Sequence, residues 1–530
     1  MEVDCASVPS KLPQAAAPTP TPPARLAAPA PAPTSPQPGT PIQILESVET
    51  VLTALILAFT FRAFFMEAFI IPTGSMAESL LGKHGTQLCP RCGWEFDYGS
   101  QDAGGPQAPF VAPPSVRCPN CHVWIDLDRE RVAARAGDRI LVHKWPYELG
   151  RLFGPRRWDV IVFRDPANPA QNFIKRVVGL PGDAVEIIDG DVFVRPRGAA
   201  EFSIARKPPA AQSALWFVVF DQSYLPQIAD ARRPPAWIAE RPDGGGWSGL
   251  DERIIRFDAR DDEPHALRFD PIEPGDYLYD VYGYNPQTPE HVVGDVRMVA
   301  EVWRRSDGGG LRWEIVRDGW TFALQMDADG DVAIRGAPPP GQPGGFALGP
   351  THIGALAQRG PLAIEFGHVD YRVYVAIDGR ERLSTSDREY APRLDALRTT
   401  TRTVPVSLRS VAWGGRFELR RLRIDRDVHY SYTPGKTQRA YAGHPFALGD
   451  QEYFVVGDNS PNSHDAREWE PVRLSPEMRS LLAGGRYHTG TVHADQIVGR
   501  GFFVYLPGLL PVDARGRWRV PDFGRIRVVR

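Results

Sequence analysis

A serine, a lysine and a short polar loop are the residues of this sequence whose types and spacing could support catalysis. Ser75 stands in IPTGSMAES and Lys175 in NFIKRVVG, while Ser463, Asp465 and Arg467 follow one another at intervals of two. A serine hydroxyl is a weak nucleophile until a neighbouring base takes its proton. Because no histidine-centred triad and no Ser-x-x-Lys motif is evident, a lysine is the candidate base.

Lys175 has the surroundings that such a base needs. Ile174 precedes it and Val177 follows closely, so its ammonium group would be partly removed from water. Burial disfavours the charged form and lowers the pKa of a lysine towards neutrality. Most strand lysines face solvent, however, and this segment alone does not identify a base.

The elements around these residues would place them at the ends of strands and of one helix. Pro72 ends an apolar segment and Gly74 permits a tight turn, so Ser75 emerges directly after that segment. LPGD at 180–183 is predicted to be a turn, and the polar loop follows an apolar strand and a Gly-Asp-Asn turn. The predicted strands are Asp159–Phe163, Phe173–Val178 and Tyr453–Val456.

The segment before Ser75 is predicted to be a transmembrane helix over residues 42–68. A bilayer core requires roughly 20 apolar residues, and this segment reaches that length only by including Arg62 and Glu67. Arg62 could extend to the interface, where the phenylalanines between 59 and 69 would form an aromatic belt. A buried amphipathic helix is the alternative. The few charges before the segment do not set its orientation.

Composition limits the remaining possibilities. Residues 1–41 are rich in proline and alanine, and we expect a disordered tail because such a segment buries too little apolar surface to fold. The formal net charge is -3, which gives no electrostatic field for nucleic acid. The 52 prolines and 50 glycines favour short strands and turns, so the predicted fold class is mainly β.

Four motifs together resemble the conserved boxes of bacterial type I signal peptidases, the S26 family with a Ser–Lys dyad. They occur in the family's order after the apolar segment and cover a minor part of the chain. Weaker likenesses in RKPPAAQSALWFVVFDQSYLP and VYGYN point to signal peptidases of planctomycete type with large insertions. The four motifs are PTGSM, GDRILV, FIKRVVGLPGD and VVGDNSPNSHDAR.

The resemblance implies a role for each candidate residue. Ser75 would be the nucleophile and Lys175 the general base, and the Ser75 backbone N–H with the Thr73 hydroxyl would form the oxyanion hole. Ser463 would hydrogen-bond Lys175, while Asp465 and Arg467 would support the site as a pair. The substrate would add as a strand and place small side chains in clefts lined by Phe69, Ile71, Pro72, Phe173 and Ile174.

Two departures from the family pattern occur near these residues. Glu78 and Ser79 stand where proline and threonine are common, and Ala466 stands where serine is common. The first departure puts the local turn after the nucleophile in doubt. Neither departure changes the two dyad residues.

The first predicted insertion, residues 84–136, carries two Cys-x-x-Cys pairs that resemble a zinc ribbon. Four thiolates are the usual ligand set of a structural zinc ion, although the 25 residues between the pairs exceed the usual spacing of 15–20. Two disulfides are the alternative, which an extracytoplasmic location would favour. The four cysteines are Cys89, Cys92, Cys118 and Cys121.

The second predicted insertion, residues 196–443, has the alternating strands of a β-sandwich. Segments such as LRWEIVR, WTFALQM and DYRVYVAIDGR are separated by turns, which is typical of antiparallel sheets. The pattern resembles a laminin-G or concanavalin-like domain. DADGD at 327–331 is expected to be a hairpin turn, since the rest of a calcium loop is absent.

The resemblance implies a membrane-bound serine endopeptidase that removes signal peptides from exported preproteins. The core would comprise residues 69–83, 137–195 and 444–530, on the extracytoplasmic side of the cell membrane. Preproteins and the bilayer would be its partners, near the secretion machinery, and catalysis would require no cofactor. Two alternatives are an inactive membrane protein whose sandwich binds glycans or proteins, and a self-cleaving repressor, which would need a DNA-binding domain.

Overall fold

The computed structural model describes residues 40–101, 109–127, 134–148, 153–225, 236–269, 280, 283–284, 291–354, 360–400, 404–431, 438–469, 474–511 and 518–530. The predicted disordered tail lies outside these residues except for its last two positions. The predicted mainly β class is confirmed, since strands far outnumber helices among the described residues. By compactness the chain divides after Phe59 into a short first unit and a second unit that holds all the strands.

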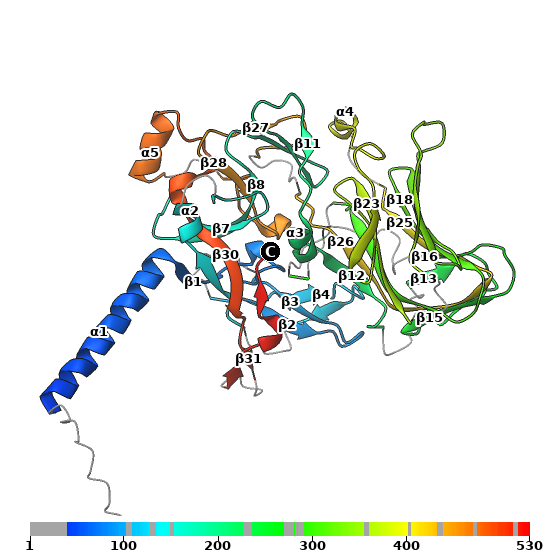
Figure 1. Ribbon diagram of the computed structural model, residues 1–530, viewed down its shortest axis with the longest axis horizontal. Coiled ribbons are helices and arrows are strands. Elements are labelled where there is room, and N and C mark those ends of the chain that lie inside the picture. The colour runs from blue at the N-terminus through cyan, green and yellow to red at the C-terminus, as the bar shows by residue number, and fades with distance from the viewer. Residues whose placement is uncertain are drawn as a thin grey trace, which may run out of the picture. The chain divides into compact units, whose positions relative to one another are not determined.

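The helix α1 spans Thr40–Phe64 and is drawn in blue in Figure 1. It ends earlier than predicted, because strand β1 (Met66–Ile70) leaves the helix and pairs antiparallel with β6 (Arg139–His143). Glu67 on β1 also forms an ion pair with Lys144 at 3.3 Å. Among the described residues, no helix is long and apolar enough to cross a membrane. The predicted spanning helix over 42–68 is therefore not confirmed.

One sheet carries the segments singled out by the four motifs. Its strand order is β1-β6-β30-β7-β8-β28-β29, with β33 paired to β30. The predicted strands of the lysine and polar-loop segments are confirmed as β7, β8 and β28. The bounds are β7 Val160–Arg164, β8 Asn172–Gly179, β28 Glu452–Val456, β29 Val492–His493, β30 Ile497–Leu506 and β33 Arg527–Val528.

The same part of the chain also forms smaller elements. A four-stranded sheet has the order β11-β10-β9-β27, and short helices lie between strands along the chain. The bounds are β9 Ala184–Ile188, β10 Asp191–Arg195, β11 Ser203–Ile204, β27 Phe446–Ala447, β31 Leu510–Pro511, β32 Arg519–Val520, α2 Trp145–Glu148, α3 Pro209–Ala214, α5 Pro476–Ala483, η3 Ser460–Asn462, η4 Ala494–Gln496 and η5 Phe523–Arg525.

The four cysteines lie at the ends of two short hairpins. Strand β2 (Gly85–Leu88) pairs with β3 (Glu95–Tyr98), and β4 (Ser115–Arg117) pairs with β5 (Trp124–Asp126). Each hairpin turn holds one Cys-x-x-Cys pair. The hairpins share a small apolar core with the cysteines.

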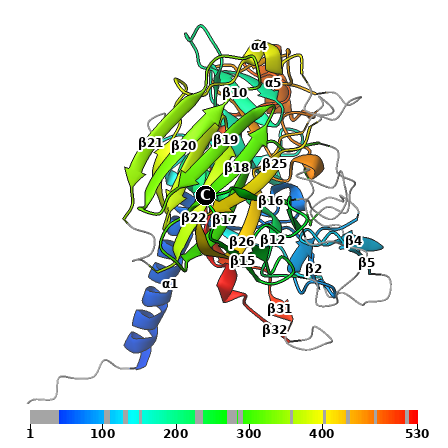
Figure 2. The same cartoon turned by 90° about the vertical axis from the view of Figure 1, so that its right-hand side faces the viewer.

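Two further sheets occupy residues 217–426 and share one large hydrophobic core. One has the order β14-β15-β26-β17-β22-β23-β24 with β12 on β26, and the other β13-β16-β25-β18-β19-β20-β21. Figure 2 shows strands β18 to β21 of the second sheet side by side. The alternating strands predicted at LRWEIVR, WTFALQM and DYRVYVAI are confirmed as β18, β19 and β23. The bounds are β12 Phe217–Asp221, β13 Trp237–Ala239, β14 Trp247–Ser248, β15 Ile254–Ala259, β16 His265–Phe269, β17 Val296–Arg304, β18 Gly310–Arg317, β19 Trp320–Met326, β20 Asp331–Ala337, β21 Phe346–His352, β22 Leu362–Val369, β23 Arg372–Ile377, β24 Arg380–Ser384, α4 Leu394–Leu397, β25 Ser407–Trp413 and β26 Gly415–Arg426.

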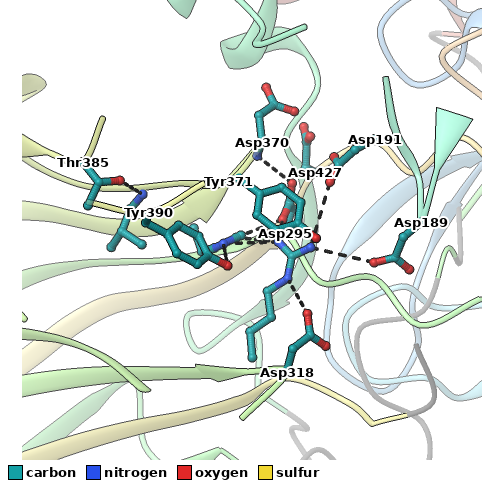
Figure 3. Close-up of polar contacts among 12 residues, drawn as sticks. Asp189, Asp191, Asp295, Asp318, Asp370, Tyr371, Thr385, Tyr390 and Asp427 are labelled. Atoms are coloured by element: carbon teal, nitrogen blue, oxygen red, sulfur yellow. Dashed lines mark hydrogen bonds and ion pairs between the residues drawn. The ribbon is translucent and has the colours of Figure 1, made fainter. Parts of the chain in front are cut away.

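A buried cluster of charges joins the four-stranded sheet to these two sheets. Carboxylate oxygens of Asp191, Asp295 and Asp370 all lie within 4.8 Å of one another. Arg317 pairs with Asp295, and Lys207 pairs with Asp370. Figure 3 shows Asp191, Asp295 and Asp370 brought together from segments far apart in the sequence. Buried charges persist only when they are paired, so the cluster depends on its two cations.

Candidate active site

The Ser75 hydroxyl and the Lys175 amine meet at strand β8, which lies between β7 and β28 in the main sheet. Ser75 lies in the short 3-10 helix η1 (Gly74–Met76), and Lys175 lies on β8. The distance from Ser75 Oγ to Lys175 Nζ is 2.6 Å. Ser75 is 8% exposed and Lys175 is 4% exposed. A nucleophile and a candidate base are thus in direct hydrogen-bond contact and shielded from water.

Burial also sets the protonation of the amine. It lowers the pKa of Lys175 from 10.5 to about 8, while the nearby Asp465 and Asp458 act in the opposite direction and Arg467 lowers the pKa further. An amine with such a pKa is neutral in a useful fraction of molecules near pH 7 to 8. The geometry therefore supports proton transfer from the serine hydroxyl to the lysine.

The turn after β28 holds the nucleophile loop through its backbone. The Asn459 side-chain amide donates to Gly74 O at 2.9 Å, and the Asn459 backbone N–H donates to Ser75 O at 3.1 Å. At Gly457, an added Cβ would lie 2.4 Å from Ser75 O, so only glycine allows this close approach. These two contacts fix the backbone on both sides of the Ser75 amide.

The Ser463 hydroxyl donates to Asp465 Oδ2 at 2.7 Å. Its position beside Ser75 is marked by Gly457, whose added Cβ would lie 2.2 Å from Ser463 Oγ and 2.4 Å from Ser75 O. Because Asp465 carries a full charge, it is a stronger acceptor for this hydroxyl than a neutral amine. The carboxylate therefore orients the hydroxyl proton, and the lone pairs of the oxygen can still accept from Lys175, so that hydrogen bond stays a prediction.

Asp465 and Arg467 lie against each other in the interior. Arg467 Nε donates to Asp465 Oδ1 at 2.9 Å, and Arg467 Nη2 donates to Oδ2 at 2.8 Å. Arg467 also donates to Ser431 O and to the Ser460 hydroxyl, both at 2.8 Å. This bidentate pair joins the polar loop to the segment that leads out of β26.

The residues predicted to line substrate clefts fall into two groups. Phe69, Ile71 and Ile174 pack in one apolar cluster, which also holds Met76 beside the nucleophile. Phe173 packs in a different cluster, against Phe163. Pro72 is half-buried, and Thr73 is exposed with no side-chain hydrogen bond capping η1. The Thr73 side chain therefore stands free to face a substrate.

Sequence reasoning missed a second buried ion pair beside the dyad. Arg176 donates from Nε and Nη2 to the two carboxylate oxygens of Asp458, each at 2.7 Å, and both side chains are fully buried. Asp138 of the GDRILV segment was also missed; it accepts from the Leu81 backbone N–H at 3.1 Å. The signal available for Arg176 and Asp458 was their position next to the motif residues Lys175 and Asn459.

Comparison with known families agrees with the motif order. The family model described as signal peptidase, peptidase S26, matches residues 131–216 and 419–506. These ranges include Lys175, Ser463, Asp465 and Arg467, whereas Ser75 precedes them. The two ranges are separated by the strands that form most of the two large sheets.

Curated proteins named signal peptidase I match part of the chain. Signal peptidase I of Pseudomonas fluorescens is 40% identical over 179 residues, which is 32% of this chain and 60% of the relative. Signal peptidase I of Rickettsia bellii (strain OSU 85-389) is 25% identical over 143 residues, 27% of this chain and 37% of the relative. The chain therefore spans less than two thirds of the length of these relatives.

Solved structures match part of the chain only distantly. The carbohydrate binding module CBM66 from Bacillus subtilis has 8% identity and a TM-score of 0.23, over 36% of this chain and 95% of that one. The laminarinase catalytic domain from Thermotoga maritima has 13% identity and a TM-score of 0.26, over 40% of this chain and 98% of that one. The family model and the curated relatives thus show that parts of the chain are similar to bacterial signal peptidase I and to the peptidase S26 family.

Proposed function

We propose that the protein is a serine endopeptidase that removes signal peptides from exported preproteins through a Ser75–Lys175 dyad. The observation that carries this proposal is the 2.6 Å contact between the two side chains in a buried site. Ser–Lys pairs are an established variant of nucleophilic acyl transfer. The similarity to signal peptidases supports the substrate class.

In this mechanism the neutral Lys175 amine takes the proton from Ser75 Oγ as the oxygen attacks the scissile carbonyl. The Lys175 ammonium then returns the proton to the leaving amine, and the acyl-enzyme is hydrolysed by a water that the same amine activates. The Ser75 backbone N–H and the Thr73 hydroxyl would stabilise the oxyanion, and one such donor contributes roughly 3 kcal/mol.

The substrate would bind as an added strand beside β8. Strand β28 pairs with β8 only from Arg176 onward, at the register Val456 to Arg176. Within the described strands, the edge of β8 at 173–175 therefore has β7 as its only partner. An extended peptide could use this edge for backbone hydrogen bonds, and Ile174 and Ile71 would limit the adjoining side chains to small ones.

A membrane location is part of the proposal. Helix α1 exposes a series of large apolar side chains, of which Leu45, Ile56 and Leu57 are each more than 60% exposed. Exposed apolar surface of this kind marks an interaction site, and a lipid surface suits a peptidase of exported proteins. Co-sedimentation of the purified protein with lipid vesicles, compared with a variant lacking residues 40–59, tests this part of the proposal.

The test of the catalytic proposal is cleavage of a preprotein by the purified full chain. We expect Ser75→Ala and Lys175→Ala each to lower the cleavage rate by about 10³-fold or more. Ser480→Ala, at an exposed position of α5, is the matched control and should cleave at the wild-type rate. Equal cleavage by all four proteins would refute the proposal.

A further inference from the structure

The four cysteine sulfurs converge on one buried point. Cys89 Sγ lies 3.6 Å from Cys121 Sγ, and Cys92 Sγ lies 3.7 Å from Cys118 Sγ. All four sulfurs lie within 4.8 Å of one another. A tetrahedral zinc ion with bonds of about 2.3 Å to sulfur holds neighbouring sulfurs about 3.8 Å apart. The observed spacing thus matches a tetrathiolate metal site.

Each pair of cysteines is shaped by the same backbone turn. Gly93 N donates to Cys89 O at 2.9 Å, and His122 N donates to Cys118 O at 2.9 Å. Both donors have a positive φ, 75° at Gly93 and 56° at His122, which turns the chain back after the second cysteine of each pair. Two such turns facing each other present four sulfurs to a common centre.

The four sulfurs are closed off from water, as expected for a structural four-cysteine site. The cysteines are at most 3% exposed and pack among apolar side chains of the two hairpins, including Phe96, Val116 and Ile125. Four thiolates in such a place would repel one another strongly without a metal. We propose that Cys89, Cys92, Cys118 and Cys121 bind one zinc ion, and that the hairpins it joins position the nucleophile loop through Tyr284.

Tyr284 links the cysteine hairpins to Ser75. Its ring is 2% exposed and lies so close to Gly74 and Gly99 that an added Cβ would approach it to 2.0 Å and 2.5 Å. Gly74 directly precedes Ser75, and Gly99 directly follows β3 of the first hairpin. Tyr284 O also accepts from Gly99 N at 2.9 Å, and its hydroxyl donates to Lys83 O at 2.9 Å.

The second hairpin lies beside Gly283, the residue before Tyr284. At Gly283, an added Cβ would lie 3.3 Å from Pro119 Cγ and 3.3 Å from Phe96 Cδ2, and Pro119 stands between Cys118 and Cys121. Asn120 in the same turn donates to Tyr224 O at 2.8 Å and accepts from Asp221 N at 2.6 Å. Contacts therefore run from the cysteine turns through residues 283–284 to the nucleophile loop.

Metal content and thiol count test the zinc site without any activity measurement. We expect about one zinc per wild-type chain, and almost none in a Cys89→Ser, Cys118→Ser double variant. Cys5→Ser is the matched control and should keep the metal. After denaturation in a chelator, all 5 cysteines of the wild type should react as thiols. A metal-free wild type would overturn the proposal. One reactive thiol per chain would then indicate two disulfides, and five would indicate free thiols.

The positioning role of Tyr284 rests on the proposed peptidase function and needs its own readout. Tyr284→Ala should lower kcat by about tenfold to a hundredfold, the cost of a small displacement of a reacting group, with KM changed much less. Tyr284→Phe keeps the ring against Gly74 and should restore most of kcat. Both variants should retain zinc. Unchanged kcat in zinc-loaded Tyr284→Ala, or a loss in Tyr284→Phe as large as in Tyr284→Ala, would overturn this role.

Misfolding and failure of the peptidase proposal give different patterns. A Tyr284→Ala protein that lost zinc and soluble yield would be unfolded. The kcat of Tyr284→Phe would then decide the positioning role alone, because this variant keeps the ring contact and should have a kcat near that of the wild type. If Ser75→Ala cleaved as fast as the wild type, the peptidase proposal would fail. The zinc content and thiol count would still stand on their own.

Discussion

Asp465 is held by Arg467 through two parallel hydrogen bonds, of 2.9 and 2.8 Å, in the protein interior. The other carboxylate near the dyad, Asp458, is bound in the same way by Arg176. Each carboxylate near Lys175 therefore has its own guanidinium, and little net negative charge remains to stabilise an ammonium ion. Burial then dominates, which explains why the pKa of Lys175 falls to about 8.

The first prediction concerns the pH dependence of cleavage. Only the neutral amine of Lys175 can accept the serine proton, and its pKa is about 8. The kcat/KM for a preprotein should therefore rise about tenfold per pH unit below 7 and level off above about 8. A rate profile from pH 5 to 10 measures this. A profile that is flat between pH 6 and 9 would exclude Lys175 as the titrating base.

The second prediction concerns the charge balance around Lys175. Arg467 lowers the pKa of Lys175 and Asp465 raises it, so Arg467→Met should raise that pKa and move the rising limb of the profile to higher pH. Arg467→Lys retains the charge and should leave the limb closer to its wild-type position. Pre-steady-state cleavage across the same pH range separates the two variants. A limb that stays in place in folded Arg467→Met would contradict the electrostatic account.

The third prediction concerns the contact between Asn459 and the nucleophile loop. Removing the side-chain amide in Asn459→Ala frees Gly74 O from a 2.9 Å hydrogen bond, and a loosened nucleophile should lower kcat by about tenfold to a hundredfold. Asn168→Ala, at an exposed loop position, is the matched control. Steady-state kinetics of both variants provide the comparison, and equal kcat values would remove Asn459 from the positioning of Ser75.

The dyad could be predicted because its signal is local in the sequence. Ser75 and Lys175 each stand in a short segment with a specific residue pattern, and the order of those segments adds information. The contact from Asn459 to Gly74 spans 385 positions, and nothing in either segment specifies its partner. The hydrogen bond from Ser463 to Asp465 depends on how the polar loop folds, which the residue pattern does not specify.

The end of α1 shows a different limit of prediction from the sequence. The sequence stays largely apolar from the helix into β1, with Arg62 and Glu67 as the charged residues of that stretch, so residue type alone does not separate the two elements. What ends the helix is pairing of Met66–Ile70 with Arg139–His143, a segment about seventy positions away in the chain. Alternating strands such as β18 and β19 were easier to predict, because each carries its period of two within itself.

The fourth prediction concerns the buried charge cluster of Figure 3, which no local pattern revealed because its carboxylates come from segments far apart in the sequence. Arg317→Met leaves Asp295 and Asp191 without their guanidinium partner, and breaking such a buried pair costs about 3–5 kcal/mol. Arg241→Met is the matched control, since its ion pair with Glu263 is 44% and 67% exposed, and ion pairs in such exposed positions contribute little to stability.

The loss in Arg317→Met should also depend on pH. The pKa of Asp191 is already raised well above its usual value, chiefly by burial, and removing a nearby cation raises it further. The folded variant then binds more protons than the unfolded chain, so its stability falls as pH rises through the neutral range. Thermal unfolding at pH 5 and pH 8 should therefore show a larger deficit at pH 8. Equal midpoints for Arg317→Met and Arg241→Met at both pH values would mean that the cluster does not stabilise the fold.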